Sequence, residues 1–204
     1  MISEASKAGV SAVKFQFHVL EDEMLKKTPK SKNFSESLYD ALKRTNFNIK
    51  QHIYLKKLCK KKGVDYLCTP FSFKSADILE KDIKLKFFKV GSGELTNLPL
   101  QMHIAKKRFP TIISTGMSNL NEITKTLNQV TKINKNIAIT QCTSMYPCNP
   151  KISDIGVIPV FMKKFKKIIG LSDHTNSIYT SIGAVALGAR IIEKHFTLNK
   201  KNIG

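Results

Sequence analysis

The stretch from residue 87 to 118, FFKVGSGELTNLPLQMHIAKKRFPTIISTGMS, contains one complete β/α unit. A short apolar run at Phe87–Val90 precedes a glycine-rich turn, and a second apolar run follows at Thr111–Ser114. Between the two runs, three apolar residues recur at helical spacing: Leu98, Met102 and Ala105. Short apolar runs bounded by Gly, Pro or Ser are typical of buried parallel strands, and the 3.6-residue period between them is typical of a helix. The stretch therefore predicts a strand, a helix and a second, parallel strand.

The same alternation extends along the chain in both directions. Seven runs have the character of strands: Ala12–Phe17, Asp65–Thr69, Phe87–Val90, Thr111–Ser114, Ile137–Gln141, Ile168–Leu171 and Arg190–His195. Four further sets of apolar residues share helix faces: Leu55, Leu58 and Cys59; Ile123, Leu127 and Val130; Val157, Phe161 and Phe165; Ile178, Ile182 and Val185. Gly63 and Gly188 are expected to end two helices, and Asn119 and Ser177 are candidate N-caps. Strands separated by helices predict a parallel β/α protein.

The glycine pattern distinguishes two parallel architectures. Gly91–Gly93 contributes a GSG sequence, but the chain lacks GxGxxG and GxxxxGK[ST], which usually follow the first strand of an open doubly wound sheet. This favours a closed (β/α)₈ TIM barrel. Because such a barrel has eight strands and needs about 250 residues, we expect an incomplete one, with its first strand before Met1 and its C-terminal segments after Gly204.

Residues 21–48 form one long polar connection. Connections of this length inside a compact unit are usually functional lids or locally disordered segments. The alternative is a short extra helix near Ser35–Leu42, and the sequence leaves both possibilities open.

The composition is that of a globular protein, with 42% hydrophobic and 24% charged residues. This excludes wholesale disorder, and the absence of a long apolar run argues against a membrane span or a secretory signal. Four cysteines stand far apart without CxxC or zinc-finger spacing: Cys59, Cys68, Cys142 and Cys148. We therefore expect reduced thiols in a cytoplasmic protein that does not associate with membranes.

The formal charge of +19 comes from 34 Lys+Arg against 15 Asp+Glu, and only three of the basic residues are arginine. Arginine is the residue that reads guanine edges and binds phosphate with a fork of two hydrogen bonds. Because the basic residues are mostly scattered lysines, solvated helix faces explain the charge better than a nucleic-acid groove does. An anionic small substrate would still benefit from the positive field.

Polar residues interrupt or follow nearly every predicted strand. Lys14 and Gln16 lie inside one strand, and Lys89 lies in another, directly before Ser92 and Glu94. A lysine is costly to bury unless it meets an anion. Hydroxyl-rich segments follow three further strands, at residues 69–72, 114–118 and 142–147. Because hydroxyls and free N–H groups at helix starts bind anions, and the carboxyl ends of barrel strands carry the chemistry, this pattern predicts a phosphate or carboxylate site.

Two histidines occupy equivalent places after the last two strands, in the segments SDHT and EKHF. Neutral imidazole is a good ligand for a divalent transition metal, so His174 and His195 could share one ion. Asp173 and Glu193 would then support the imidazoles or pair with lysines.

Seven motifs in chain order resemble the sialic acid synthase family, which comprises N-acetylneuraminate synthases and their legionaminic and pseudaminic acid relatives. The motifs are VKFQ, CTPFS, KVGSGEL, ISTGMS, CTSMYP, GLSDHT and IIEKHFTL, between Val13 and Leu198. The resemblance implies that residues 1–204 are part of a TIM-barrel domain of a transferase. Such an enzyme condenses phosphoenolpyruvate with N-acetylmannosamine or a di-N-acetylated hexose and water, giving a nine-carbon α-keto sugar acid and phosphate. It also implies a cytoplasmic homodimer, without nucleic-acid or membrane partners.

The resemblance also implies roles for individual residues. Seven would hold phosphoenolpyruvate: Lys14, Thr69, Lys89, Ser92, Ser114, Ser144 and Ser172. Gln16 and Tyr146 would face the sugar, and Glu94 would act at the reacting centre together with the two histidines. His174 and His195 would ligate Mn²⁺, with Mg²⁺ or Co²⁺ as alternatives. Many family members have Asn where this chain has Ser144.

The chain departs from the family pattern at both ends. It lacks the first-strand segment resembling GxNHxG, the GPDH segment, and the C-terminal antifreeze-like domain. Three alternatives therefore stay open: an inactive truncated fragment, a basic nucleic-acid-binding module, and another phosphoenolpyruvate or pyruvate aldol-type TIM-barrel enzyme. In the last case Lys14, Lys89 or Lys194 could form a Schiff base. The motifs KVGSGEL and CTPFS favour an N-acetylneuraminate or legionaminate synthase over a pseudaminate synthase.

Overall fold

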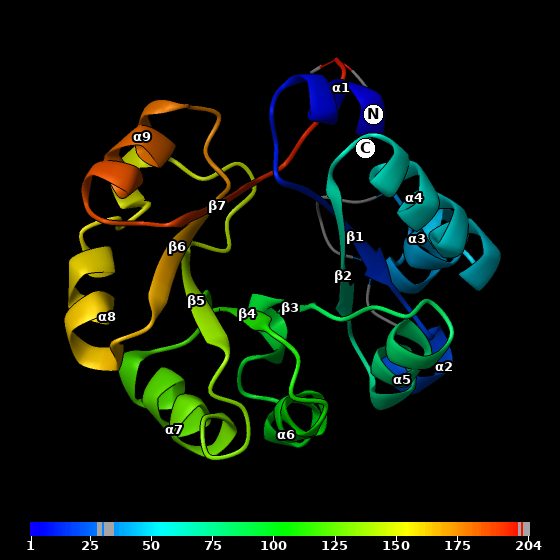
Figure 1. Ribbon diagram of the computed structural model, residues 1–204, viewed down its shortest axis with the longest axis horizontal. Helices are drawn as coiled ribbons and strands as arrows, with labels where there is room; N and C mark the ends of the chain where they lie inside the picture. The colour runs from blue at the N-terminus through cyan, green and yellow to red at the C-terminus, as the bar shows by residue number, and fades with distance from the viewer. Residues whose placement is uncertain (28–29, 31–34, 200, 202–204) are drawn as a thin grey trace. The chain divides into compact units, whose positions relative to one another are not determined.

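The computed structural model describes residues 1–27, 30, 35–199 and 201 (Figure 1). The chain divides into two compact units, Met1–Phe88 and Lys89–Gly204. No helix in the described part of the chain is long and apolar enough to cross a membrane.

Among its described residues, the first unit contains two parallel strands and the start of a third, with five helices. The strands are β1 (Ala12–Phe17), β2 (Asp65–Pro70) and β3 (Phe88–Val90), and the helices are α1 (Ile2–Lys7), α2 (Leu20–Glu23), α3 (Leu38–Thr45), α4 (Ile49–Lys61) and α5 (Phe73–Lys81). β1 pairs with β2 along its whole length, from Ala12 opposite Asp65 to Phe17 opposite Pro70. Cys68 of β2 lies opposite Phe88 of β3. Each strand is therefore parallel to the next one in the sequence.

The second unit continues the alternation with four strands. They are β4 (Thr111–Ser114), β5 (Ile137–Cys142), β6 (Ile168–Asp173) and β7 (Ile191–Lys194). The helical segments are η1 (Ser92–Glu94), α6 (Leu98–Lys106), α7 (Leu120–Val130), η2 (Pro150–Ile152), α8 (Val157–Phe165) and α9 (Tyr179–Ala186). β4, β5, β6 and β7 pair in this order, all parallel. Figure 1 shows α7, α8 and α9 along one side of these strands, which leaves the other side to the residues considered below.

The predicted parallel α/β class is confirmed, and all seven predicted strands are present. Two of them, Ala12–Phe17 and Thr111–Ser114, have the predicted bounds, and β6 runs two residues further than expected, to Asp173. The eighth strand and the closure of a TIM barrel stay predictions.

Helix ends follow the local signals in most cases. The Asn119 side chain accepts from the N–H of Glu122, whose carboxylate accepts from the N–H of Asn119, so the predicted N-cap is part of a capping box. Gly63 and Gly188 have φ values of +70° and +103°, which only glycine adopts readily, and both follow a helix. Ser177 is wrong as the N-cap of α9 by one residue: Ile178 has that position, and the Ser177 hydroxyl accepts from the N–H of Tyr179.

The predicted helix faces are correct for α7 and wrong for α9. Ile123, Leu127 and Val130 of α7 are buried. On α9, by contrast, Ile178, Ile182 and Val185 are 64%, 58% and 55% exposed, while Thr180 and Ala184 are buried. Small side chains let this helix lie close to β6, and periodicity alone does not tell which face turns toward the sheet.

The other predicted faces are correct only in part. α6 buries Leu100, Gln101 and Ile104 together with the expected Ala105, rather than Leu98 and Met102. Cys59 of α4 and Phe161 of α8 are buried as expected, while Leu55, Leu58, Val157 and Phe165 are half-buried. In α4, α6 and α8 the apolar residues that recur in the sequence therefore lie near the buried face of the helix, but do not coincide with it.

The long connection at residues 21–48 contains a short helix, which confirms that alternative. Helix α3 covers Leu38–Thr45, and its N-cap is Ser37, whose hydroxyl accepts from the N–H of Asp40. Residues 28, 29 and 31–34 of this connection lie outside the described residues. All four cysteines are buried free thiols, in agreement with the expected reduced state.

A buried histidine in the first unit gives stability a predictable dependence on pH. His52 of α4 is fully buried, and its Nδ1 accepts from the Tyr66 hydroxyl at 2.5 Å. Burial, and secondarily the charge of His18, lowers the pKa of His52 to about 4. In the unfolded chain the pKa of histidine is about 6.5, so the unfolded state takes up a proton first as the pH falls.

The free energy of unfolding is therefore expected to drop by about 2–3 kcal/mol between about pH 7 and about pH 4.5, the window between the two pKa values. Urea unfolding at both pH values measures the drop. The His52→Gln variant keeps an acceptor for Tyr66 without a titrating ring, so most of this drop should vanish. An equal drop in the variant would assign the effect to other groups.

Candidate active site

The carboxyl ends of the second unit's strands share a polar face. The register places Ser114 opposite Thr140, and Ser172 opposite both Cys142 and Glu193. Because side chains alternate along a strand, residues paired in this way project to the same side of the sheet. The predicted residues Ser114 and Ser172 therefore lie on the face that also carries Glu193.

Lys89 is the centre of a buried polar chain on this face. Its Nζ donates to the Ser114 hydroxyl at 2.5 Å and lies 3.1 Å from a carboxylate oxygen of Glu193. The Ser114 hydroxyl in turn lies 2.8 Å from that of Thr140. The Lys89 side chain is 4% exposed and that of Glu193 is 23% exposed. A buried ammonium needs such partners, and Glu193 is the lysine partner that the sequence predicted.

Three strand-end segments meet at Gly116. Its N–H donates to the Ser92 hydroxyl at 3.1 Å. A Cβ at this position would overlap the Ser144 and Ser92 hydroxyls and touch Cys142 Sγ, so only glycine fits without displacing them. The predicted residues Ser92 and Ser144 are thus brought together. The sequence analysis missed Gly116 and Cys142, although Gly116 follows Ser114 by two residues in a motif that it singled out.

Cys142 and His174 form a thiol–imidazole contact beside these hydroxyls. The Sγ of Cys142 lies 3.8 Å from both His174 Nδ1 and Ser144 Oγ. Burial opposes ionisation of both groups, but hydrogen bonds from His174, Ser92 and Ser144 bring the pKa of Cys142 below its ordinary value. Hydrogen bonds to Cys142 and to the Thr143 carbonyl likewise raise the pKa of His174. The contact adds a polarisable thiol to the site.

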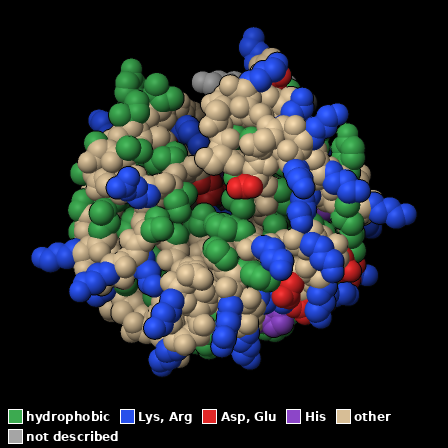
Figure 2. Space-filling model, viewed as in Figure 1, with side chains coloured by type: hydrophobic (Ala, Val, Ile, Leu, Met, Phe, Trp, Pro, Cys, Tyr) green, Lys and Arg blue, Asp and Glu red, His purple; other side chains and the backbone are tan. Residues whose placement is uncertain are grey.

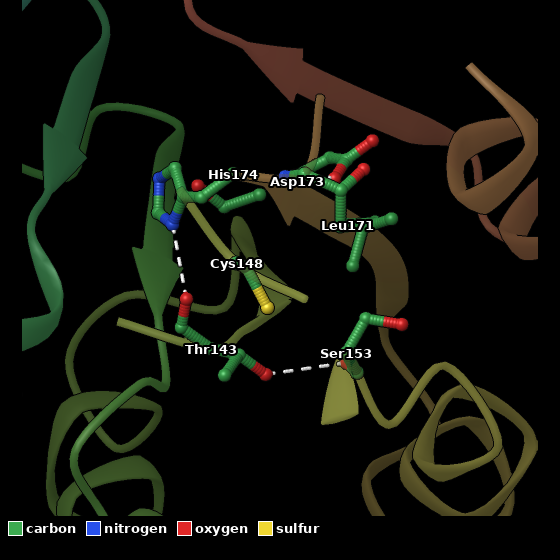
Figure 3. A pocket seen from close by; sticks show the side chains of 8 residues that line it. Thr143, Cys148, Ser153, Leu171, Asp173 and His174 are labelled. Carbon is green, nitrogen blue, oxygen red and sulfur yellow. Dashed lines mark hydrogen bonds between the residues drawn. The ribbon is translucent and has the colours of Figure 1, made fainter. Parts of the chain in front are cut away.

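The two predicted histidines lie next to each other. Their ring centroids are 5.3 Å apart, and Tyr146 lies 4.1 Å from the ring of His174 and 5.6 Å from that of His195. His174 Nδ1 donates to the Thr143 carbonyl at 3.1 Å (Figure 3). In the neutral ring this leaves the lone pair on Nε2. The structure therefore brings together Tyr146, His174 and His195, which follow β5, β6 and β7.

This pair fits a divalent ion as a two-nitrogen donor set. The described part of the chain has no group of three or more His, Cys, Asp or Glu that could hold a metal. An ion held by His174 and His195 alone would have further coordination positions open to other ligands, as a catalytic metal needs.

Two hollows lie near His174: its side chain lines one, and Cys148, whose N–H donates to the His174 carbonyl, lines both. The one in Figure 3 lies behind His174 and is narrow, with Thr143, Cys148, Ser153 and Asp173 among its lining residues. The other is an open cleft of about 470 Å³ between residues 147–150 and Asn176–Ser177, directly after Tyr146 in the chain. The open cleft is the one with room for part of a sugar.

Glu94 lies in η1, directly after β3. Its carboxylate accepts from the Asn97 side chain at 2.7 Å, and its carbonyl accepts from Gln101 at 2.9 Å. These bonds fix the loop on α6, but the role of Glu94 at a reacting centre stays a prediction.

The remaining predicted residues belong to the first unit. Gln16 lies opposite Thr69, and Lys14 opposite Leu67, so these residues share one face of β1 and β2. The other face packs in the core, where Phe15 stacks on Tyr66. Thr69 Oγ1 is buried without a hydrogen-bond partner among the described residues, as a ligand-binding hydroxyl would be. That these residues bind the same substrate as Lys89 stays a prediction.

Gln16 has neighbours that the sequence analysis did not identify. Its side-chain oxygen lies 3.4 Å from His18 Nε2, and His18 Nδ1 lies 2.7 Å from Glu23. The Asn46 side chain donates to the His18 carbonyl at 2.8 Å, which ties α3 to the end of β1. The long connection therefore helps to hold a predicted sugar-binding residue.

Comparison with known proteins identifies the family. The NeuB family model matches residues 1–204. The chain is 38% identical to the N,N'-diacetyllegionaminic acid synthase of Campylobacter jejuni, over 100% of this chain and 64% of that protein. It is 34% identical to the human N-acetylneuraminate-9-phosphate synthase, over 98% of this chain and 57% of that protein. The chain thus spans about three-fifths of the length of these relatives.

Solved structures give the same result. The N-acetylneuraminic acid (sialic acid) synthetase of Leptospira borgpetersenii, crystallised in complex with citrate, superposes with a TM-score of 0.86 at 30% identity. The match covers 98% of this chain and 67% of that one. Fold, ordered motifs and relatives agree, and the chain belongs to the NeuB family.

Proposed function

We propose that this protein joins phosphoenolpyruvate to an N-acetylated amino sugar and water, giving a nine-carbon α-keto sugar acid and phosphate. The observation that carries the proposal is the buried Lys89 ammonium, held by Ser114 and Glu193 beside the hydroxyls around Gly116. A fixed cation next to several hydroxyls suits a small dianion such as an enol phosphate. Family membership supports the same reaction, since relatives are named as sialic and legionaminic acid synthases.

Five residues of the second unit would hold the phosphate and carboxylate of phosphoenolpyruvate: Lys89, Ser92, Ser114, Ser144 and Ser172. The family resemblance assigns Lys14 and Thr69 of the first unit to the same ligand. The unpaired Thr69 hydroxyl supports its assignment to a ligand. Because these groups are already in place, they would stabilise the charge that develops as the phosphate leaves, which lowers the barrier.

His174 and His195 would hold the divalent ion, with Mn²⁺ as the expected metal. When bound, such an ion polarises the aldehyde of the open-chain sugar as a Lewis acid. The Thr143 carbonyl keeps the Nδ1 proton of His174 in place, which supports Nε2 as the donor atom. Tyr146 and Gln16 would orient the sugar, and the cleft after Tyr146 has room for its substituents.

The residues of the chain would then guide the bond changes. C3 of phosphoenolpyruvate would bond to the aldehyde carbon with the electrons of the C2–C3 π bond. The aldehyde π bond opens and its oxygen takes up a proton, while positive charge develops at C2. The Glu94 carboxylate would stabilise that charge. Water adds at C2, and the resulting tetrahedral carbon releases phosphate to give the keto group.

Two alternatives are less well supported. A Schiff-base lysine must react as the neutral amine, whereas Lys89 is paired with Glu193 and Lys194 with Asp173. Failure of borohydride to trap pyruvate on the protein would agree with this. A nucleic-acid module would need a continuous basic groove, and on the face seen in Figure 2 the Lys and Arg side chains are scattered.

Release of phosphate tests the proposal. The purified protein with Mn²⁺ and phosphoenolpyruvate is expected to release phosphate when N-acetylmannosamine or a di-N-acetylated hexose is added, in equal amount to the keto sugar acid formed. No release should occur without sugar or after EDTA treatment. A folded protein that binds phosphoenolpyruvate and releases no phosphate with any N-acetylated hexose would contradict the proposed activity.

A further inference from the structure

We propose that the ion pair between Asp173 and Lys194 positions the two histidines, and thereby sets the affinity of the site for a divalent cation. The inference rests on the proposed function, because it concerns the ion that His174 and His195 would hold. Asp173 and Lys194 are positioning residues in this proposal, and neither would touch the ion.

The ion pair joins β6 to β7 at the residues directly before the two histidines. Asp173 of β6 and Lys194 of β7 are register partners, and each directly precedes one histidine in the chain. Alternation along the strands puts this pair on the side of the sheet opposite Ser172 and Glu193. The Ser181 hydroxyl of α9 reaches Asp173 at 2.7 Å, which places the pair on the helix-covered side.

The ion pair also fixes the residue that follows His174. Lys194 Nζ donates to one Asp173 oxygen at 2.8 Å and to the Thr175 carbonyl at 2.6 Å. The other Asp173 oxygen accepts from the N–H of Thr175 at 2.8 Å. The Asp173 side chain is 1% exposed and that of Lys194 is 32% exposed. Both backbone polar groups of Thr175 are thus tied to the pair, and His174 lies between two anchored residues.

The spacing of the two imidazole rings would depend on this ion pair. Asp173 and the His174 ring lie on opposite sides of the backbone that joins them (Figure 3). A shift of the Asp173–Thr175 turn would therefore move the His174 ring relative to His195, now 5.3 Å away between centroids. His174 retains two other anchors, since its Nδ1 donates to Thr143 and its carbonyl accepts from the N–H of Cys148. Loss of the ion pair should loosen the pair of rings without unfolding the site.

If Lys194 acted only through its positive charge, its removal would strengthen cation binding rather than weaken it. The two explanations therefore predict opposite results. Lys194→Met removes a positive charge close to a cation site and leaves Asp173 negative. By Coulomb attraction the variant would bind a divalent cation more tightly. A weaker affinity can then come only from the lost positioning.

Mn²⁺ binding followed by electron paramagnetic resonance measures this without turnover. Lys194→Met is expected to weaken Mn²⁺ binding about tenfold, the lower end of what supporting residues contribute in metal sites. Lys194→Arg, which can keep the ion pair, should stay within about threefold of the unmodified protein. Lys56→Met is the matched control: the Lys56 ammonium also donates to two backbone carbonyls, but in the first unit, and its loss should leave Mn²⁺ binding unchanged.

A double-variant cycle keeps the proposal falsifiable if one substitution perturbs folding. Asp173→Asn combined with Lys194→Met should bind Mn²⁺ no more weakly than the worse single variant, because both remove the same anchor. Additive losses would overturn the proposal, and so would Mn²⁺ binding by Lys194→Met as tight as, or tighter than, that of the unmodified protein. Absence of Mn²⁺ binding in the unmodified protein itself would instead overturn the proposed metal site.

Discussion

Lys89→Met is expected to lower kcat/KM for phosphate release by about 10³-fold, and to weaken phosphoenolpyruvate binding as well. The Lys89 ammonium is held in one position by Ser114 at 2.5 Å and Glu193 at 3.1 Å, and little of it is open to solvent. Methionine has nearly the same length but no charge, so the incoming dianion would lose the attraction of this ammonium. Initial rates and isothermal titration with phosphoenolpyruvate measure the two effects.

A second lysine separates this local effect from the loss of one charge. Lys167→Met makes the same change at a residue whose ammonium donates to the Lys135 carbonyl at the protein surface, so both rate and affinity should stay unchanged. If Lys89→Met retains activity within about tenfold of the unmodified protein, the phosphate is not bound by this ammonium and the assignment of the site is wrong.

The strands were predictable because their signal is local. Runs such as Thr111–Ser114 combine buried apolar residues with flanking turn residues, and the structure gives that strand the expected bounds. Which face of a helix turns inward is not local information. On α9 the larger apolar side chains of Ile178, Ile182 and Val185 are exposed, and the smaller Thr180 and Ala184 pack against the sheet.

The candidate site was predictable to the extent that parallel strands align their carboxyl ends. His174, His195 and Tyr146 come from three segments and do meet, as do Ser92 and Ser144. The contacts that depend on register were missed. The Thr140 hydroxyl beside Ser114 is an example, because a strand residue becomes a site residue only when its neighbour's register is known.

Gly116→Ala is expected to reduce kcat/KM about 10²-fold while costing only about 1 kcal/mol of stability. The added Cβ would overlap the Ser144 and Ser92 hydroxyls and touch Cys142 Sγ. Serine hydroxyls can rotate away, so the fold tolerates the methyl group. The rotation turns these hydroxyls from the positions in which they would bind the phosphate, and the Gly116 N–H loses its bond to Ser92. Thermal unfolding and phosphoenolpyruvate titration measure the two effects separately.

Gly156→Ala is the matched control, since a Cβ at Gly156 meets nothing within 4 Å. It should leave both stability and phosphoenolpyruvate binding unchanged. Comparing the two variants distinguishes an anion-binding role of Gly116 from a purely structural one. If Gly116 only allowed a tight turn, Gly116→Ala would lower stability and leave phosphoenolpyruvate affinity unchanged. An alanine at residue 116 that keeps phosphoenolpyruvate affinity within about threefold would therefore show that the hydroxyls around Gly116 do not bind the anion.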